Sequence, residues 1–373
     1  MKTLVVKIGS SVLTLENGDP DHKRFASITK DVARVMERGY AVVVVSSGAI
    51  AFGRAIAGGR LAPAGMAEKQ VLSSIGQPLL INAYMHNFRP YNKTVCQVLL
   101  THEDFMDRQR YLNARRSMEL MLYKGFVPVV NENDAIAVDE IKVGDNDTLS
   151  AMVAAMINAD RLIILSNIDA IYDRDPNKYD DARPLHEIRH TDQHKKIDGT
   201  KSKYGVGGIK TKLTAAKQLA RLGISTTIVN GRTEGIVSSL VDHIEKKTGV
   251  LPGTTILAGV RKVNGAKRWV GLLLKSSGSI AIDKGAMSAL LADKSLLAAG
   301  VTRAEGAFKE GDVVDVVDDS GHKVGRGITN YAVAEIELIK GMKSSQIKSA
   351  LGYFKGDEVV HRDNLMLDVL EKD

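Results

Sequence analysis

Short aliphatic runs recur through the first 230 residues, with amphipathic segments between several of them. The runs are "TLVVKI", "AVVVVS", "VCQVLL", "FVPVV", "RLIILS" and "STTIV". In "FASITKDVARVMERG" apolar residues recur at helical spacing from Phe25 to Met36, and Gly39 ends the pattern. The segment "DTLSAMVAAMINA" has the same spacing. Apolar strands that alternate with amphipathic helices are typical of an α/β fold, with a mainly parallel sheet sandwiched by helices.

The pattern changes after about residue 245. The segment "KKTGVLPGTTILAG" contains Gly and Pro but no sustained period, which predicts a connection. Beyond Trp269, turn residues separate the short strand-like pieces "GSIAI", "GDVVDVV" and "YAVAEIELI". We therefore expect an α/β domain over residues 1–250, a linker over 251–268, a small β-rich domain over 269–355 and a C-terminal tail over 356–373.

Composition narrows the class of protein. The chain has 373 residues, 44% apolar and 25% charged, which is typical of a soluble globular protein with two domains. No run approaches the ~20 apolar residues that span a bilayer, and the N-terminus lacks a signal-peptide pattern. The single cysteine, Cys96, can form no internal disulfide and no cysteine cluster for zinc. We expect a cytoplasmic protein with no membrane partner.

Charge is unevenly distributed along the chain. The formal net charge is +7, yet residues 260–373 carry 17 Lys/Arg and 16 Asp/Glu, so the surplus lies in the first part. A mild positive surplus suits anionic small molecules, whereas a nucleic-acid module more often has a concentrated basic face.

Polar stretches follow several of the predicted strands. They are Lys7-Ile8-Gly9-Ser10-Ser11, Ser46-Ser47-Gly48-Ala49, Asn131-Glu132-Asn133-Asp134 followed by "VGDNDTLS", and Ser166-Asn167-Ile168-Asp169. The late segment "YGVGGIKTKLTAA" is of the same kind. In an open α/β sheet, ligands collect outside the carboxyl ends of the strands. We therefore expect these stretches to converge on one edge of the sheet.

The residue types in these stretches are consistent with phosphoryl transfer. Glycines and hydroxyls let backbone N–H groups approach phosphate oxygens, and lysines neutralise the charge. Two lysines and an organising carboxylate are sufficient parts for such catalysis. The chain has no Gly-Lys dipeptide, which excludes the usual P-loop. It also lacks Gly-x-Gly-x-x-Gly, which argues against a dinucleotide fold and a protein-kinase glycine loop.

Each of these stretches also has a purely structural interpretation. Lys7 is consistent with a lysine at a strand end, and Asp147 with the N-cap of a helix. Ser47-Gly48 is consistent with a simple turn, and Gly207-Gly208 with a flexible hairpin. The residues from Asn131 to Asp134 are consistent with a polar loop of Asx turns.

Taken in order, the motifs of the chain resemble those of the glutamate 5-kinases, within the amino acid kinase family. The first domain carries "VVKIGSSVLT", "VVVSSGAIAFG", "QVLLTHEDFMDRQRYLNAR", "VPVVNENDAIAVDEIKVGDNDTLSA", "IYDRDP" and "GVGGIKTKLTAA". The second carries "KRWVG", "SIAIDKGA", "GVTRAEGAFKEGD", "GRGITNY" and "VVHRDNL", similar to the PUA domain, a small β-rich barrel, of many bacterial members. The pairing of Asn-Glu-Asn-Asp with Gly-Asp-Asn-Asp is specific, because aspartokinases and uridylate kinases are not expected to share it.

The resemblance implies transfer of the γ-phosphate of ATP to the side-chain carboxylate of L-glutamate, the first step of proline biosynthesis. It implies that Lys7 and Lys212 stabilise the transferring phosphoryl group and that Asp147 holds these lysines. Ser47, Asp134 and Asn146 would bind glutamate. The residues that would bind ATP are Lys7, Gly9, Ser10, Ser166, Asn167, Val206, Gly207, Gly208, Ile209, Lys210, Thr211 and Lys212. Mg²⁺ would be carried by ATP, with no metal site in the protein itself.

Two motifs depart from the family pattern on the nucleotide side. Members commonly have Thr-Asp where this chain has Ser166-Asn167, and Gly-Thr-Gly-Gly-Met where it has Gly205-Val206-Gly207-Gly208-Ile209. These departures put the ATP contacts and the nucleotide preference in question, whereas the glutamate side has no comparable difference.

Other functions stay open. A kinase of the same fold could act on aspartate, carbamate or another small acid, and PUA domains elsewhere contact RNA, which makes an RNA-binding protein the alternative from a different class. The resemblance further implies inhibition by proline and a homo-oligomer, either dimer or tetramer. Because proline shares the α-carboxylate and the amine of glutamate, we expect it to compete at an overlapping site near Ser47 and Asp134.

Overall fold

The computed structural model describes residues 1–61, 63, 65–137, 146–176, 178–189, 209–246, 252–259 and 276–367. The chain divides into two compact units, Met1–Lys262 and Val263–Asp373. Each unit has its own cluster of buried apolar side chains.

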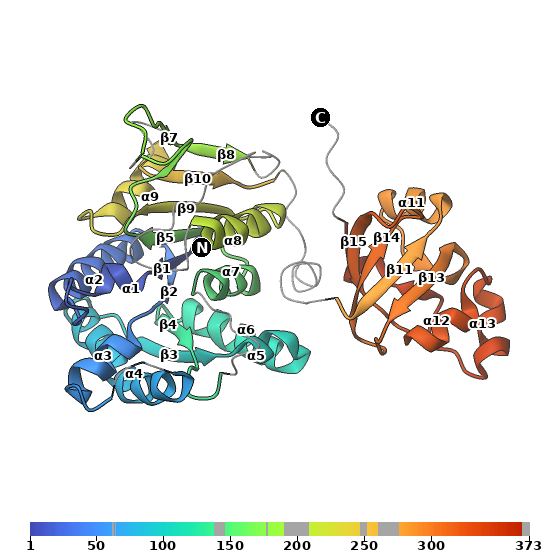
Figure 1. The fold of residues 1–373 in the computed structure, drawn as a ribbon, viewed down its shortest axis with the longest axis horizontal. Helices are drawn as coiled ribbons and strands as arrows, with labels where there is room; N and C mark the ends of the chain where they lie inside the picture. The colour runs from blue at the N-terminus through green and yellow to red at the C-terminus, as the bar shows by residue number, and fades with distance from the viewer. Residues whose placement is uncertain are drawn as a thin grey trace. The chain divides into compact units, whose positions relative to one another are not determined.

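Strands and helices alternate through the first unit (Figure 1). Its strands are β1 (Thr3–Ile8), β2 (Ala41–Val45), β3 (Val95–Leu100), β4 (Val127–Glu132), β5 (Arg161–Ser166), β6 (Ile171–Tyr172), β7 (Pro184–Leu185), β8 (Glu187–Arg189), β9 (Ser225–Asn230) and β10 (Thr254–Leu257). Its helices are α1 (Ser10–Leu13), α2 (His22–Glu37), α3 (Ala49–Ala57), α4 (Met66–Phe88), α5 (His102–Met106), α6 (Arg108–Tyr123), α7 (Asn146–Met156), α8 (Ile209–Arg221) and α9 (Ile236–Lys246), with the 3₁₀ turn η1 (Arg89–Tyr91). All six aliphatic runs quoted above lie in strands, as predicted.

Eight strands form one sheet in the order β3-β4-β2-β1-β5-β9-β10-β8. Neighbouring strands from β3 to β9 are parallel, while β10 runs antiparallel to β9 and parallel to β8. The predicted mainly parallel sheet is therefore confirmed. The prediction of a connection around β10 was wrong, because Thr254 and Thr255 are buried in the ladder. A strand of 4 residues is too short to give a periodic pattern.

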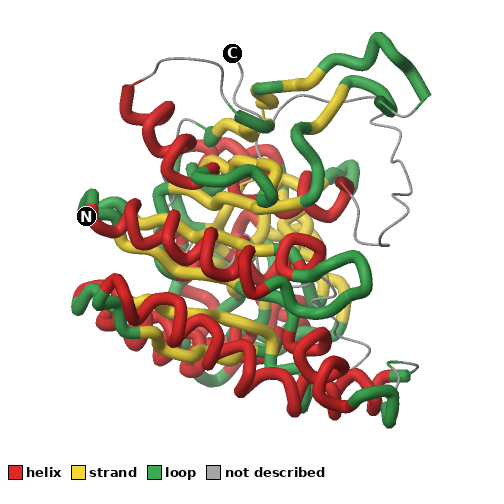
Figure 2. Tube along the Cα trace, turned by 90° about the vertical axis from the view of Figure 1, so that its left-hand side faces the viewer, coloured by secondary structure: helices red, strands yellow, loops and turns green. Residues whose placement is uncertain are grey.

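Helices cover both faces of this sheet (Figure 1). On one face α2 contacts both α4 and α9, and on the other α7 contacts α8 and β1. In the side view of Figure 2, red helices lie in front of yellow strands. The predicted helix is confirmed in α2: Asp21 accepts a hydrogen bond from the Arg24 N–H at its start, and Gly39, with φ of +87°, follows its end.

The second unit combines short strands with short helices. Its strands are β11 (Gly278–Ile282), β12 (Leu296–Leu297), β13 (Val301–Gly306), β14 (Val313–Val317), β15 (Lys323–Ile328), β16 (Glu358–Val360) and β17 (Leu365–Leu367). Its helices are α11 (Lys284–Leu291), α12 (Val333–Ile339) and α13 (Ser344–Leu351), with the 3₁₀ turns η3 (Ala298–Gly300) and η4 (Arg362–Asn364). Five strands form a sheet in the order β13-β11-β14-β15-β17, and β12 pairs with β16. Both β16 and β17 come from the segment expected to be a tail.

The segment "YAVAEIELI" was predicted to be strand-like, but it forms α12, which corrects that prediction. The Glu335 carboxylate accepts a hydrogen bond from the Ala332 N–H at 2.6 Å, which caps the first turn. Ile336 and Ile339, spaced as on one helical face, are both fully buried. Local capping and core packing therefore select the helix over the strand.

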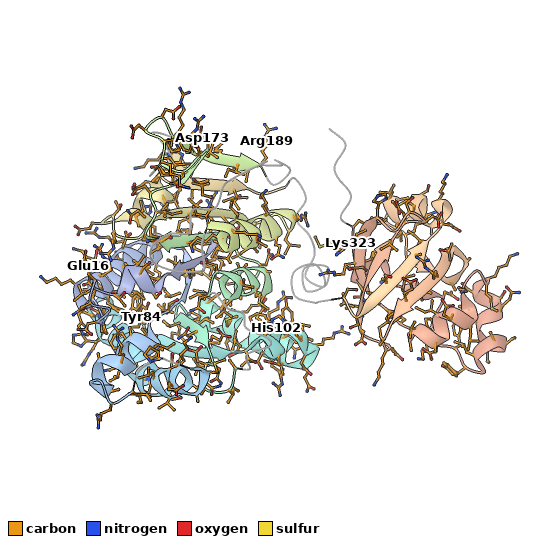
Figure 3. The ribbon with its side chains drawn as sticks, viewed as in Figure 1. Glu16, Tyr84, His102, Asp173, Arg189 and Lys323 are labelled. Carbon is orange, nitrogen blue, oxygen red and sulfur yellow. The ribbon has the colours of Figure 1, made fainter. Side chains whose placement is uncertain are left out.

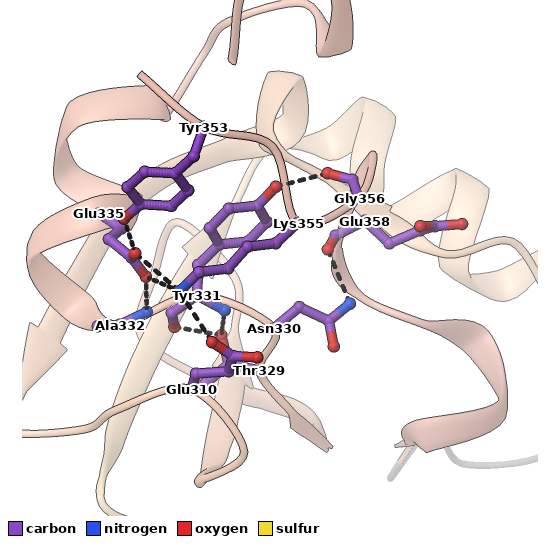
Figure 4. A network of polar contacts seen from close by, with 10 residues as sticks. All are labelled: Glu310, Thr329, Asn330, Tyr331, Ala332, Glu335, Tyr353, Lys355, Gly356 and Glu358. Atoms are coloured by element: carbon purple, nitrogen blue, oxygen red, sulfur yellow. Dashed lines mark hydrogen bonds and ion pairs between the residues drawn. The ribbon is translucent and has the colours of Figure 1, made fainter. Parts of the chain in front are cut away.

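A polar network joins the start of α12 to the chain beyond α13 (Figure 4). The Lys355 ammonium lies 2.8 Å from a carboxylate oxygen of Glu310 and 2.8 Å from one of Glu335. The same ammonium lies over the ring of Tyr331, whose hydroxyl donates to the Gly356 carbonyl at 2.5 Å. The network fixes the approach to β16.

Candidate active site at the carboxyl edge of the first sheet

Two lysines from distant segments bind one buried carboxylate. The Nζ of Lys7, near the end of β1, lies 2.5 Å from Asp147 Oδ1, and the Nζ of Lys212, in the first turn of α8, lies 2.8 Å from Asp147 Oδ2. The three side chains expose only 5%, 0% and 13% of their surface, in the order Lys7, Asp147, Lys212. Buried charges need such pairing. Because α7 begins at Asn146, Asp147 lies inside the helix and directs its carboxylate to the lysines.

Gly9 lets the chain pass close to β5 directly after β1. Its N–H donates to the Leu165 carbonyl at 3.1 Å, and a Cβ built on Gly9 would lie 3.3 Å from that oxygen and 3.9 Å from Lys7 Nζ. A side chain here would crowd the Leu165 carbonyl oxygen of β5. Ser10 follows, exposed, at the start of α1.

A second cluster lies beside the lysine pair and is centred on Asn146, the neighbour of Asp147. The Asn146 Nδ2 donates to the Ser46 carbonyl at 2.6 Å, to Ser47 Oγ at 2.9 Å and to Asn131 Oδ1 at 3.1 Å. These contacts join the ends of β2 and β4 to the start of α7. The expected convergence of Ser47 and Asn146 is observed.

Asp134 lies in the turn that follows β4, three residues after Asn131. Its Oδ2 accepts a hydrogen bond from Ser73 Oγ, in α4, at 2.7 Å. Burial raises the pKa of Asp134, and the Ser73 hydrogen bond opposes that rise.

A cavity of about 560 Å³ brings these groups together. It is lined by Ser10, Thr14, Gly18, Ser47, Gly48, Ala49, Ile50, Ala51, Arg54, Pro63, Met66, Lys69, Gln70, Asn131, Glu132, Asp134, Ala137 and Asn146. All three residues expected to bind glutamate are among them. The cavity therefore offers a carboxylate at Asp134, hydroxyl and amide groups at Ser47 and Asn146, and cations at Arg54 and Lys69.

The sequence interpretation did not single out α4 as part of the site. Ser73, Gln77 and Tyr84 are buried polar residues on this helix, and each makes a hydrogen bond to a residue of the site region: Asp134, Asn131 and Ser46 respectively. Tyr84 is labelled in Figure 3. Polar residues at 3- or 4-residue intervals, such as Gln70, Ser73 and Gln77, within an apolar helix were the available signal.

The residues expected on the nucleotide side are only partly described. Ile8 in β1 pairs with Leu165 in β5, so Ser166 lies at the level of Gly9, and its hydroxyl lies 3.4 Å from Asn167 Oδ1. The segment from Ile209 to Lys212 forms the first turn of α8. Val206, Gly207 and Gly208 lie outside the described residues.

Among the described residues, no three or more His, Cys, Asp or Glu side chains are placed to hold a metal ion. Within the same part of the chain, every helix is too short or too polar to cross a membrane.

Comparisons with known proteins identify relatives of both units. The model of the amino acid kinase family matches residues 2–230, and that of the PUA domain matches residues 278–351. The glutamate 5-kinase of Thermoanaerobacter sp. is 42% identical over 367 residues, covering 98% of this chain and 97% of that protein. The glutamate 5-kinase of Thermus thermophilus has the same identity and coverage, 42%, 98% and 97%. A solved carbamate kinase from Giardia lamblia bound to AMP-PNP is 18% identical with a TM-score of 0.48, covering 69% of this chain and 99% of that one.

The family models and the two glutamate 5-kinases agree with the motifs along the whole chain. The chain therefore belongs to the amino acid kinase family, among the glutamate 5-kinases with a C-terminal PUA domain.

Proposed function

We propose that this protein transfers the γ-phosphate of ATP to the side-chain carboxylate of L-glutamate, giving L-glutamyl 5-phosphate and ADP, the first step of proline biosynthesis. Relatives named glutamate 5-kinase match 98% of the chain and support this proposal. The observation that carries it is the pairing of Lys7 and Lys212 on Asp147, next to a cavity whose lining suits an amino acid.

The two lysines serve the transfer step by electrostatics. An oxygen of the glutamate carboxylate forms a bond to the γ-phosphorus while the bond from that phosphorus to the β–γ bridging oxygen breaks. Two unit charges 4 Å apart repel by about 4 kcal/mol near a protein surface, so anions need cations between them. Lys7 and Lys212 supply these charges, and Asp147 holds them in place. No general base is needed, because the glutamate side chain is ionised at pH 7.

The cavity residues bind the acceptor. Asp134 pairs with the glutamate ammonium. Ser47 Oγ accepts a hydrogen bond from Asn146, so its own proton is oriented to donate, and a glutamate carboxylate is a suitable acceptor. Lys69 and Arg54, which also line the cavity, add positive charge for the second of the two glutamate carboxylates.

ATP lies against the turn at Gly9 and Ser10 and against the first turn of α8, from Ile209 to Lys212. Mg²⁺ on the β- and γ-phosphates, when bound, neutralises part of the charge that develops during transfer. In our proposal the nucleotide carries this ion.

ATP consumption with and without L-glutamate tests the proposal, with hydroxylamine present to trap the acyl phosphate as a hydroxamate. We expect glutamyl hydroxamate from wild type and at least about a 100-fold loss of turnover in Lys212→Ala. Lys217→Ala, one turn further along α8, is the matched control. Aspartate and carbamate are tested in parallel, and hydroxamate from aspartate but none from glutamate would reject the glutamate assignment.

Regulation and assembly complete the proposal. Proline carries the same α-carboxylate and an amine, so it competes with glutamate near Ser47 and Asp134. Asp134→Ala should weaken glutamate binding and proline inhibition together, and unchanged inhibition would place proline elsewhere.

The enzyme acts as a homo-oligomer, which analytical ultracentrifugation of the full chain tests.

A further inference from the structure

Hydrogen bonds link the side chains of Asn146, Asn131 and Gln77 in series, and the last of them lies in α4. Asn146 Nδ2 donates to Asn131 Oδ1 at 3.1 Å, and Asn131 Nδ2 donates to Gln77 Oε1 at 2.8 Å. Asn131 and Gln77 expose only 3% and 8% of their surface. Buried amides of this kind need their hydrogen bonds, so the direction in which each one points is coupled to the next.

The oxygen of Gln77 decides the orientation of Asn131. With an acceptor at position 77, the Asn131 amide turns its NH₂ group toward α4 and its oxygen toward Asn146. Without that acceptor, nothing at position 77 receives the NH₂ group, and the amide can turn over. Its NH₂ group would then face the NH₂ group of Asn146, which removes a hydrogen bond and opposes two donors.

Close packing holds Gln77 in its place. A Cβ built on the preceding residue, Gly76, would lie 1.8 Å from the Ala49 carbonyl oxygen of α3, so the two helices touch backbone to backbone. Ala49 directly follows Ser47-Gly48 in sequence. The helix that carries Gln77 is therefore packed against the same turn that carries the Ser47 hydroxyl.

We infer that Gln77 is a positioning residue of the acceptor site: its side-chain oxygen fixes the amide of Asn131, and through it the contact between Asn146 and Ser47. The inference rests on the proposed function, because Asn146 and Ser47 are the residues assigned to glutamate. Gln77 itself does not line the cavity.

Steady-state kinetics of Gln77→Met test this inference. Met has a similar size but no acceptor oxygen, so we expect the KM for glutamate to rise about tenfold, the effect of one lost hydrogen bond. The KM for ATP should stay near that of wild type. A purely structural defect would instead reduce the amount of active enzyme, which lowers kcat and leaves both KM values unchanged. Gln97→Met, on an exposed position of β3, is the matched control.

Gln77→Glu tests whether position 77 acts as a hydrogen-bond acceptor for Asn131. The test stands even if the Met variant does not fold. The introduced Glu side chain has the same length as Gln and keeps an acceptor oxygen whether or not it is protonated. We expect the KM of the Gln77→Glu variant for L-glutamate to stay within about threefold of the wild-type value. A tenfold rise in Gln77→Glu would overturn the inference, because an acceptor oxygen at position 77 would then not be sufficient to hold the contact between Asn146 and Ser47.

A double-mutant cycle with Asn131→Ala separates action through Asn131 from an independent effect. In the Asn131→Ala background, Gln77→Met should raise the KM for glutamate no further, and multiplying effects would overturn the inference. An unchanged KM for glutamate in the Gln77→Met single variant would also overturn the inference if the wild-type enzyme makes glutamyl hydroxamate. Absence of hydroxamate from wild type would instead reject the proposed function, and the inference with it.

Discussion

Lys7 and Asp147 form an ion pair with 2.5 Å between Nζ and Oδ1, in which the side chains expose 5% and 0% of their surface. The other oxygen of the same carboxylate contacts Lys212. Two cations on one carboxylate place positive charge at the carboxyl edge of the sheet, and a phosphoryl group is a suitable ligand for such charge. The arrangement also makes Asp147 responsible for the positions of both lysines.

Asp147→Asn should therefore abolish most of the activity while keeping the side-chain size. Without the carboxylate the two ammonium groups repel each other and lose their common anchor. We expect kcat to fall at least about 100-fold, with a small effect on the KM for glutamate. The measurement is steady-state ATP turnover with glutamate. Asp242→Asn, on the more exposed side of α9, is the control, and an equal loss of kcat in both variants would contradict the assigned role.

The hydrogen bond from Ser73 to Asp134 predicts a pH effect. Burial raises the pKa of Asp134, and this hydrogen bond opposes the rise. Asp134 binds the substrate ammonium only as a carboxylate, so kcat/KM for glutamate falls as the pH drops through that pKa. Ser73→Ala removes the opposing contribution, which raises the pKa further. The acid limb of the kcat/KM profile should move to higher pH.

Ser74→Ala provides the control for this pH effect, because Ser74 is the exposed neighbour on α4 and donates to the Gln70 carbonyl. Ionisation of glutamate itself contributes equally to all profiles and cancels in the comparison. An acid limb at the same pH in Ser73→Ala and wild type would argue against Asp134 as the ammonium partner.

Much of the first unit could be predicted from its sequence, because burial imposes a period on strands and helices. Two predictions were wrong, one in each unit. The strand β10 is only 4 residues long, and its place in the sheet depends on pairing with β9. In α12, alternating apolar residues suggested a strand, but the cap from Glu335 and the burial of Ile336 select a helix.

The convergence of the strand ends was predictable, but the individual side-chain contacts and the part played by α4 were not. The residues that end the strands were expected to converge, and Ser47 and Asn146 do so. By contrast, Asn131 and Gln77 are 54 positions apart in sequence, and a single sequence contains no signal that pairs them. The roles of the individual residues stay predictions, which the variants described here test.

Gly76→Ala should destabilise the first unit. Its Cβ would lie 1.8 Å from the Ala49 carbonyl oxygen and 2.5 Å from the Gly53 nitrogen, so α3 and α4 must separate. Overpacking of this kind costs up to about 3 kcal/mol. We expect a lower melting temperature and, because Ala49 follows Ser47-Gly48, a higher KM for glutamate. Calorimetry and kinetics measure the two effects, and a variant with wild-type values in both would contradict the close contact.

Lys355→Met should loosen the chain around β16 without affecting catalysis. The hydrogen bonds that the Lys355 ammonium donates to Glu310 and Glu335 hold its pKa above its usual value. The contribution of Lys355 to stability is therefore fully present below the ordinary lysine pKa of about 10.4 and is lost only as the pH rises through the raised pKa. The substitution should lower the free energy of local opening around β16 by about 1 kcal/mol, and by the same amount at about pH 7 and 9. Hydrogen exchange of residues 352–360 in the full chain, followed by mass spectrometry, measures it. Lys340→Met is the control, because within the described part of the chain this lysine pairs with the exposed Glu337 at the end of α12. It should leave this exchange unchanged, and equal protection in both variants would contradict the network.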